Sequence, residues 1–545
     1  MGTVERLANW AAELSIGDVP EPVLALCRAQ RASVLGAVAA SAGDGAARRV
    51  LRGLEAWGAE GAVPLPGSGR RLRAEDALYG AAALSIALDF DDYVCFAHTG
   101  HSAVLVPLVL AAETGASGSE QLVAQVVANE VGGRLGGACL LGPLNGQLWS
   151  FVHAAGAALA AGRLLGLDAR QLAHALALAL YQAPRPTVPG FMGPDSKLLT
   201  AAEPAVLGLR AARLAAAGVS GPLDVLDDRR GFFEAFSYAP LPALLQHLGS
   251  GWVTSTLSVK RYPGCAYVDT AVDALLELGP IESQEIAALE VDAGMLSCEM
   301  DAMARRHASP VGPPTPVTVT FSLPWTLAVT ALAGQLTPAQ THDAWLEHHA
   351  DELSRLVERV AVHHDWRSTG ATAAAMAPLL PPGPLLAGAR PGRVLSALRR
   401  LRHEHEPLRL GPGEALGLLR LMRADGKNSW GEMARSAELW RPEALESFRM
   451  TFPARVRLRL SDGRVLAAAV DVPAGGAGRV DLPPALVARE KLRTYGPLMW
   501  GTSGTDRLVQ AIDDDAEDLS SLVGATPTAE HASGVAGALR DAAHD

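Results

Sequence analysis

The sequence predicts a mainly α-helical protein with a smaller α+β domain. Apolar residues recur every three or four positions through most of residues 1–245, and strand-like alternation begins only near residue 252. Alanine, leucine and glycine dominate, and only 5% of the residues are aromatic, which favours closely packed helices. Because 545 residues exceed what one hydrophobic core normally serves, we expect at least two domains.

The first domain is expected to span residues 1–252 and to consist of helices. Apolar positions at three- and four-residue spacing predict helices over 23–40, 76–90, 103–114, 120–131, 151–166 and 170–181. Two of them have start signals, Ser-Gly-Ser at 117–119 and Asp-Ala-Arg-Gln at 168–171. Many of these segments are apolar nearly all round, which is typical of helices buried on several sides.

The second domain is expected to span residues 253–483 and to contain the strands. The clearest strand signal runs from Arg455 to Leu466, where charged and apolar residues alternate and an Asp-Gly pair at 462–463 predicts a hairpin turn. Further strands are predicted from Thr254 to Val259 and from Glu285 to Val291, with weaker patterns from Val317 to Phe321 and from Val360 to His363. Helices over 267–278, 325–334 and 339–359 complete an α+β unit.

Residues 367–449 differ from their surroundings, and we interpret them as an inserted helical module. They contain a Pro/Gly/Ala-rich run and then a basic helix from Arg393 to Arg402. Glutamates follow these arginines closely, so a solvated helix face is favoured over a nucleic-acid surface. The acidic, Ser/Ala-rich tail, residues 512–545, is expected to be flexible.

Composition argues against several classes of function. A net charge of −11 is unlike a general nucleic-acid binder. The five cysteines are scattered without a CxxC pair, so we expect no disulfide scaffold, no zinc site and a reducing cytoplasm. The N-terminal amphipathic helix carries charges, unlike a signal peptide. The uncharged stretch 135–162 is broken by Gly-Pro at 142–143, so a buried helix is favoured over a membrane span.

The stretch LDFDDYVCFAHTGH, residues 88–101, concentrates three aspartates and two histidines beside a helix. It is followed in order by PLVLAAE, by the helix-pair sequence AAETGASGSEQLVAQVVANEVGGRL, by GAALAAGRLLGLDARQLAHALALA, by SKLLTAAEP, by VKRYPGCAYVDTAVDALLEL, by FSLPWTLAVTALAGQLT and by FPARVRLRLSDGR. This ordered set, over roughly residues 5–365 and 450–505, resembles the MmgE/PrpD family. That family includes 2-methylcitrate dehydratase, cis-aconitate decarboxylase and an iminodisuccinate epimerase.

The resemblance implies an architecture and a chemistry. It implies a large helical domain, joined by a returning C-terminal helix at about 484–511, and an α/β lid with the active site in the cleft between them. It also implies a homodimer and reactions without metal or organic cofactor. Relatives eliminate water, lose CO₂ or invert a carbon next to a carboxylate, so they need an acid, a base and fixed cations for carboxylates.

Five residues are candidates for the catalytic roles. Asp89 matches the family's first aspartate, and either His98 or His101 supplies an acid or base, because imidazole titrates near neutrality. Lys197 and Lys260 are candidates for binding the carboxylate, since a lysine is a compact positive charge. Asp91 is expected to cap a helix or to pair structurally.

Several positions depart from the family pattern. Gln147 stands where relatives have a second active-site histidine, Tyr93 replaces a threonine and Trp325 replaces a tyrosine, while Asp269 replaces a further histidine. His153 is interpreted as a buried helix histidine. These changes remove proton donors and add aromatic surface, so we expect a larger, less polar substrate and a role in specialised metabolism. The full set of expected substrate-binding residues is Asp92, Tyr93, Gln147, Arg261, Tyr262, Cys265 and Trp325.

The sequence therefore favours a cofactor-independent lyase, of dehydratase or decarboxylase type, acting on a small carboxylic acid. Two alternatives stay open: an isomerase or epimerase of the same family, and a catalytically inactive member that binds a ligand. We expect a small-molecule carboxylate as the substrate and a second copy of the chain as partner, with no nucleic acid and no membrane.

Overall fold

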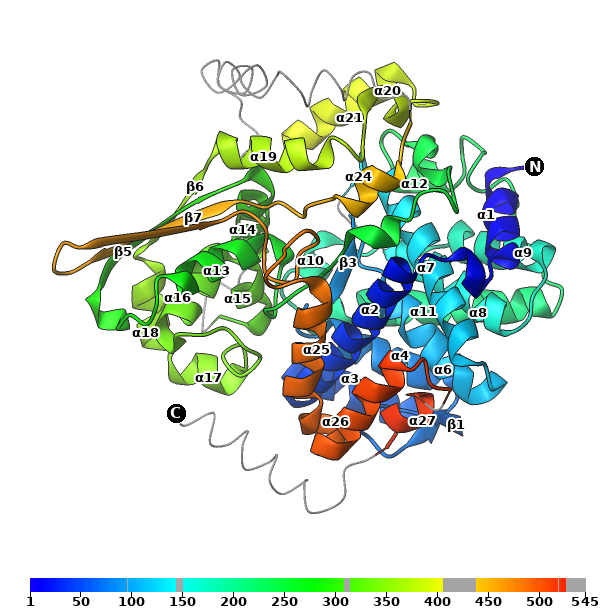
Figure 1. Ribbon diagram of the computed structural model, residues 1–545, viewed down its shortest axis with the longest axis horizontal. Helices are drawn as coiled ribbons and strands as arrows, with labels where there is room; N and C mark the ends of the chain where they lie inside the picture. The colour runs from blue at the N-terminus through cyan, green and yellow to red at the C-terminus, as the bar shows by residue number, and fades with distance from the viewer. Residues whose placement is uncertain (96, 144–149, 308–313, 405–437, 518, 526–545) are drawn as a thin grey trace.

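The structure is a computed structural model that describes all residues except 96, 144–149, 308–313, 405–437, 518 and 526–545. It has a large helical part and a smaller part around a four-stranded sheet (Figure 1). Each part has its own cluster of buried apolar side chains, as the chain length indicated.

The helical part packs long, alanine-rich helices against one another. Its main members are α1 (Thr3–Glu13), α2 (Glu21–Ala40), α3 (Gly45–Trp57), α4 (Ala74–Ile86), α6 (Leu105–Thr114), α7 (Gly118–Ala138), α8 (Ser150–Leu164), α9 (Ala169–Tyr181) and α11 (Leu199–Ala216). All six predicted helices are present. Ser117 and Asp168 cap α7 and α9 by accepting from backbone amides one turn on, which confirms both start signals.

Small residues set the spacing of these helices. A Cβ added to Gly208 of α11 would lie 2.3 Å from the carbonyl oxygen of Ala154 in α8, so the two backbones touch there. Helix α2 is long and apolar enough to span a membrane by length and composition, but 83% of its apolar window is buried inside the fold. Among the described residues it is the only such helix, and its burial is what a core helix requires.

The smaller part contains a sheet with strand order β6-β5-β7-β8. Its strands are β5 (Ile286–Ala293), β6 (Val360–His364), β7 (Ala454–Leu460) and β8 (Val465–Val470), with β6 parallel to β5 and the others antiparallel. Helices α13 (Asp269–Glu277), α14 (Met295–His307), α16 (Leu323–Ala333), α17 (Asp343–His348) and α18 (Ala350–Val357) accompany the sheet (Figure 1).

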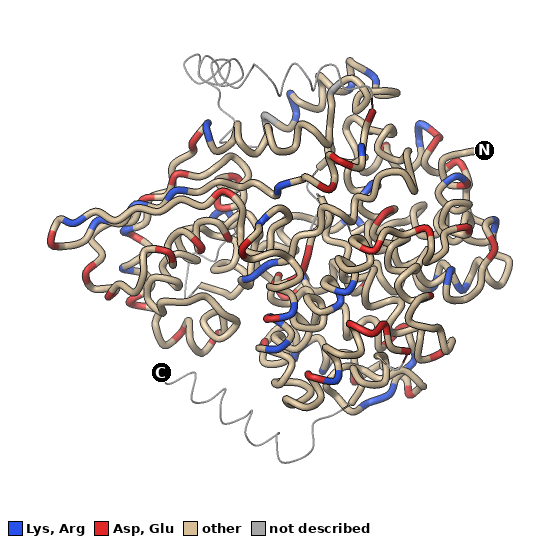
Figure 2. Tube along the Cα trace, in the orientation of Figure 1, with Lys and Arg blue, Asp and Glu red and all other residues tan. Residues whose placement is uncertain are grey.

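The predicted hairpin is confirmed, with its turn at Asp462 and Gly463. Alternate residues of β7 are buried, so its arginines lie on the other face. There Arg457 pairs with Glu290 at 2.8 Å and with Asp292 at 2.6 Å, and Figure 2 shows basic and acidic residues side by side on these strands. The basic strand is thus matched by acids within its own sheet.

Two strand predictions need correction. Val317 to Phe321 is the helix α15 (Pro316–Phe321), not a strand, because Thr315 caps it and Pro316 occupies its first turn. Of the strand predicted from Thr254 to Val259, only β4 (Leu257–Val259) forms, and a 3₁₀ turn from Val253 to Thr256 precedes it.

The C-terminal segment returns to the helical part, as expected, but as two helices. They are α25 (Pro484–Tyr495) and α26 (Pro497–Asp513), separated at Gly496, and α25 packs along α2. The predicted flexible tail, residues 512–545, contains the end of α26 and a packed helix, α27 (Leu519–Val523), whose Val523 carbonyl accepts from the indole of Trp500 at 2.7 Å. Residues 526–545 lie outside the described residues.

The predicted insert is packed against the fold at both described ends. It contains α19 (Trp366–Met376), α20 (Pro382–Leu385), α21 (Pro391–Glu404) and α24 (Pro442–Glu446), with 405–437 outside the described residues. Trp440, near its end, is 2% exposed and belongs to the helical core. In α21, Arg393 pairs with Glu234 at 3.1 Å and Arg400 lies over the ring of Tyr238.

Candidate active site

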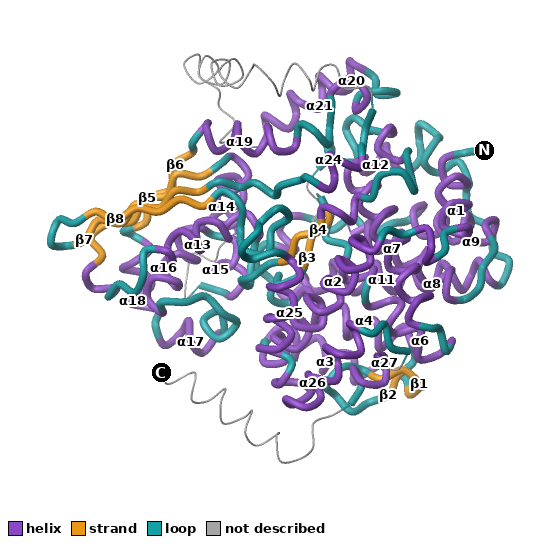
Figure 3. Tube along the Cα trace, viewed as in Figure 1, coloured by secondary structure: helices purple, strands orange, loops and turns teal. Residues whose placement is uncertain are grey.

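A short two-stranded ladder brings together two motifs that are distant in sequence. Strand β3 (Asp92–Val94) pairs antiparallel with β4, between the two parts of the molecule (Figure 3). The ladder continues irregularly, because the amide of Lys260 donates to the carbonyl of Asp91 at 3.1 Å. The LDFDDY and VKRYPGC segments therefore form one unit, and their charged side chains meet at its end.

Asp89 lies between the two lysines that the sequence singled out. Its carboxylate is 3.0 Å from Lys197 Nζ and 3.0 Å from Lys260 Nζ, and all three side chains are buried. Asp89 has a φ of 51°, a left-handed conformation that aspartate tolerates better than most residues. Burial alone would raise the pKa of this carboxyl, but Lys197 and Lys260 outweigh it and lower the pKa.

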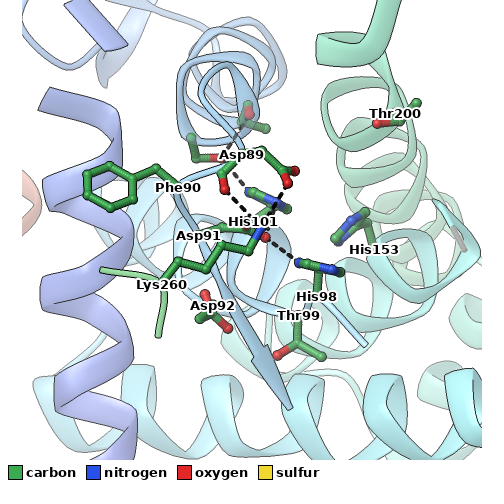
Figure 4. A network of polar contacts seen from close by, with 12 residues as sticks. Asp89, Phe90, Asp91, Asp92, His98, Thr99, His101, His153, Thr200 and Lys260 are labelled. Carbon is green, nitrogen blue, oxygen red and sulfur yellow. Dashed lines mark hydrogen bonds and ion pairs between the residues drawn. The ribbon is translucent and has the colours of Figure 1, made fainter. Parts of the chain in front are cut away.

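The carboxylate of Asp91 contacts Lys260 and both histidines, His98 and His101 (Figure 4). One carboxylate oxygen accepts from Lys260 Nζ at 2.7 Å, and the other lies 2.6 Å from His98 Nδ1 and 3.0 Å from His101 Nε2. Burial raises the pKa of Asp91, but Lys260 and the histidines bring it well below its usual value. Since an ionised carboxylate only accepts, His98 Nδ1 carries the donated proton.

The two lysines differ in their electrostatic surroundings. Burial lowers the pKa of both, but Asp89 and Asp91 together more than reverse this for Lys260, whose pKa is raised. For Lys197 the pKa stays lowered, because burial and the repulsion of Lys260 exceed the attraction of Asp89. Lys260 is therefore a fixed positive charge, and Lys197 is the more readily deprotonated of the pair.

A cavity opens beside this cluster. Its empty volume, which includes the open mouth, is about 760 Å³. Its charged or titratable polar lining consists of Asp89, His98 and Lys260. The other described lining residues are mainly apolar or aromatic: Tyr93, Cys95, Phe191, Cys265, Ala266, Tyr267, Leu296, Met300, Met303, Phe321, Thr372, Met376 and Phe452.

The geometry distinguishes the two candidate histidines. His98 lines the cavity, and its side chain is 15% exposed. His101 is fully buried between Asp91 and Ser85, whose hydroxyl is 2.7 Å from its Nδ1. His153 lies behind His101 with ring centroids 5.2 Å apart, and burial holds its pKa well below the usual value, so it is a neutral helix histidine as expected.

Some of the expected substrate-binding residues lie at the cavity and others do not. Tyr93 and Cys265 line it, and burial raises the pKa of Cys265 to about 12, which suits packing rather than nucleophilic attack. Tyr262 is buried and donates to Asp273 at 2.7 Å, and neither residue is among the lining. Gln147 lies outside the described residues.

Asp92, Arg261 and Trp325 are also absent from the described lining. Asp92 is fully buried and accepts from Gln30 at 2.7 Å, on the side of the loop away from the cavity. Burial and the neighbouring charge of Asp91 raise its pKa to about 6. Arg261 is exposed, and Trp325 packs at the edge of the α/β core.

Asp91, expected to cap or pair structurally, does pair, and its carboxylate contacts Lys260, His98 and His101. Sequence reasoning missed two other features of the site. Lys491 of α25 donates to the backbone carbonyl of Phe90 at 2.9 Å and to Ser33 at 3.0 Å, and nothing in its local sequence marked it. The apolar wall had a signal, since Met300 and Met303 are spaced to share one helix face.

Comparison with known proteins identifies the family. The MmgE/PrpD N-terminal domain matches residues 5–244, and the MmgE/PrpD C-terminal domain matches residues 262–378. The chain belongs to the MmgE/PrpD family. The second match extends past residue 367, where we expected an insert to begin, and so includes α19.

Similar curated proteins are fungal. A cis-aconitate decarboxylase of Aspergillus terreus is 29% identical over 301 residues, which is 51% of this chain and 60% of the relative. The cis-aconitate decarboxylase-like protein oryM of Aspergillus oryzae is 28% identical over 296 residues, 50% of this chain and 61% of that protein. The chain thus matches about three-fifths of the length of these relatives. At the level of the family, these matches support a lyase of dehydratase or decarboxylase type.

Proposed function

We propose that this protein is a cofactor-independent lyase that acts on a small carboxylic acid by proton transfer next to a carboxylate. The observation that carries the proposal is the position of His98, which lines the cavity while Asp91 holds its Nδ1 and Lys260 lies beside both. An imidazole oriented by a carboxylate can take or give a proton through its other nitrogen.

The lysines supply the second requirement, a fixed positive charge. Removing a proton or CO₂ next to a carboxylate builds negative charge on the substrate, and a buried ammonium stabilises it strongly because water is excluded. Lys260 is buried, charged and part of the cavity lining, while Lys197 contacts the same Asp89 carboxylate from behind. A substrate carboxylate in the cavity would compete with Asp89 for Lys260.

Competition between a substrate carboxylate and Asp89 would allow Asp89 to take part in proton transfer. Lys197 and Lys260 hold the pKa of Asp89 below its usual value. A bound anion that drew one lysine away would raise the pKa of Asp89, because the charge opposing protonation would fall. Asp89 would then be able to accept a proton during the reaction, with His98 as its counterpart.

Two alternatives predict different results. An isomerase or epimerase would use the same proton transfers but return the proton to carbon without losing a group. A catalytically inactive ligand-binding member is the second, and one observation favours it: Lys197 and Lys260 are already paired with carboxylates of the protein itself.

A panel of hydroxy acids and unsaturated acids, followed by NMR in D₂O, separates these three functions. A lyase releases water or CO₂, an epimerase incorporates deuterium without loss of a group, and a binder does neither while still raising the melting temperature. Lys260→Met and Asp89→Asn should abolish turnover, whereas Arg48→Met, an exposed cation on α3, should not. Turnover that survives Lys260→Met would overturn the proposed role of this lysine.

Three further expectations from the family resemblance remain proposals. We propose that the protein acts as a homodimer, that it operates in the cytoplasm and that it needs neither nucleic acid nor membrane. Light scattering coupled to gel filtration tests the first, and a mass of one chain, 56.8 kDa, would contradict it.

A further inference from the structure

The cavity has one polar end and several apolar walls. The charged side chains Asp89, His98 and Lys260 gather at one end. The apolar lining includes Met300 and Met303 from α14, three positions apart on one helix face, and Met376 from α19. Phe191, Phe321 and Phe452 complete these walls, and all three are at least 95% buried.

The charges at the polar end already balance. Lys197 and Lys260 contribute two positive charges, and Asp89 and Asp91 contribute two negative charges within 3.0 Å of them. Among the described lining residues there is no arginine and no lysine other than Lys260. One incoming carboxylate can pair with Lys260, but a second would find no further cation among the described lining residues, and a desolvated carboxylate without an opposite charge is strongly unfavourable.

Methionine walls suit a flexible apolar group. Methionine side chains are unbranched and polarizable, so they adapt to alkyl or aromatic substituents of different shape. Besides the three methionines, the cavity lining contains the aliphatic side chain of Leu296 and the rings of Phe191, Phe321 and Phe452, so an apolar group of the ligand would meet a mixed aliphatic and aromatic surface.

We propose that the site takes a carboxylic acid with a single carboxylate at the polar end and an alkyl or aromatic group against the methionine wall, rather than a di- or tricarboxylate. This inference rests on the proposed function for the location of the carboxylate, but it concerns which acids fit. The residues that set this preference are Met300, Met303 and Met376.

Binding of unreactive saturated acids tests the preference without any turnover. The probes are hexanoate, 3-phenylpropionate, succinate and propane-1,2,3-tricarboxylate, measured by calorimetry on the full chain. We expect the two monocarboxylates to bind at least tenfold more tightly than the tricarboxylate. Equal or tighter binding of the tricarboxylate would overturn the inference, as would no binding of either monocarboxylate.

A charge placed on the wall provides the complementary test. Met303→Lys should weaken 3-phenylpropionate at least tenfold and strengthen propane-1,2,3-tricarboxylate by a similar factor. Met376→Lys, on a different helix and partly exposed, should act in the same direction if Met303→Lys does not fold. Met295→Lys on α14 is the matched control, because Met295 is outside the lining, and it should change neither affinity. Unchanged affinities in both wall variants would contradict the inference.

The two proposals fail in different ways. If no acid is turned over but monocarboxylates bind as expected, the lyase proposal fails and the ligand class stands. If only di- or tricarboxylates are turned over, the lyase proposal stands and the ligand class is wrong.

Discussion

At the scale of single residues, the Asp91 carboxylate holds two functional side chains at once. One oxygen bonds Lys260 and the other bonds His98, so the position of the imidazole and that of the ammonium depend on the same group. His101 and Ser85 brace the carboxylate from the buried side. We therefore regard Asp91 as a positioning residue and His98 as the group that meets the substrate.

Asp91→Asn should lower kcat/KM by at least about 100-fold, the usual scale of losing an oriented acid or base. The amide can donate to His98 and so favours the wrong tautomer of the imidazole. The pH profile should also shift, because the negative charge beside His98 disappears. Asp292→Asn, which removes a carboxylate paired with Arg457 on the sheet, is the control. An unchanged pH profile in Asp91→Asn would count against the pairing.

Lys491 should make stability depend on pH. Burial lowers its pKa from 10.5 to about 7 in the folded chain, so between these values the unfolded chain binds more protons. Stability should therefore rise with pH from about 7 to 10.5, by up to about 1.4 kcal/mol per pH unit from this group.

Urea unfolding at pH 7, 8 and 9 measures this dependence as the difference between the wild type and Lys491→Met. The difference should grow in favour of the wild type as the pH rises. Arg489→Met, an exposed cation on the same helix, should follow the wild-type slope. Parallel slopes for Lys491→Met and the wild type would show that Lys491 is not deprotonated in the fold.

At the scale of elements, the loop from Asp89 to β3 depends on a close approach by α5 (Gly100–Ala103). A Cβ at Gly100 would lie 1.9 Å from Asp92 Oδ1, so a larger residue must displace that buried carboxylate. Asp92 in turn is held by Gln30 of α2. The polar contacts behind the loop fix which aspartate faces the cavity.

Gly100→Ala should destabilise the fold by about 1–3 kcal/mol, the typical cost of overpacking. It should also reduce activity, because Asp92 lies in the same strand as Tyr93 of the cavity lining. Thermal unfolding and turnover are the measurements. Gly392→Ala, which meets no atom within 4 Å, is the control and should be close to neutral. A stable, fully active Gly100→Ala would show that the loop can shift freely.

Local sequence predicted the elements better than the contacts of single side chains. Periodicity predicted six helices of the helical part, all of which are present, but it did not indicate α3 or α11, and alternation with an Asp-Gly turn identified the hairpin. It did not identify α15, because β-branched residues from Val317 to Thr320 suggest a strand while Thr315 and Pro316 start a helix. Asp91 contacts Lys260 and His98 whereas the adjacent Asp92 contacts Gln30, a difference of one residue that no local pattern reports.

Contacts between residues that are far apart in the sequence were also not predictable from local patterns. Lys197 and Lys260 were identified through the family resemblance, and both do contact Asp89. Lys491 bonds to Phe90 across 401 residues of sequence, and only the packing of α25 on α2 brings them together. No alternating or helical pattern could have indicated that contact.

At the scale of the whole molecule, the cavity lies where the helical part and the α/β part meet. Asp89 and His98 come from the helical part, Met300 and Phe321 from helices beside the sheet, and Met376 from α19. The cavity lining therefore combines side chains from both parts of the fold, and a change in either part can alter which acid fits.

The central claim is that His98 moves a proton on an acid held by Lys260. Its most direct test is the rate at which deuterium from D₂O enters the substrate carbon next to the carboxylate, for any acid that the wild type turns over. We predict that His98→Asn loses at least about 100-fold of this rate while it still binds the acid, and that His348→Asn, an exposed histidine, loses none. Exchange at the wild-type rate in His98→Asn would contradict the account.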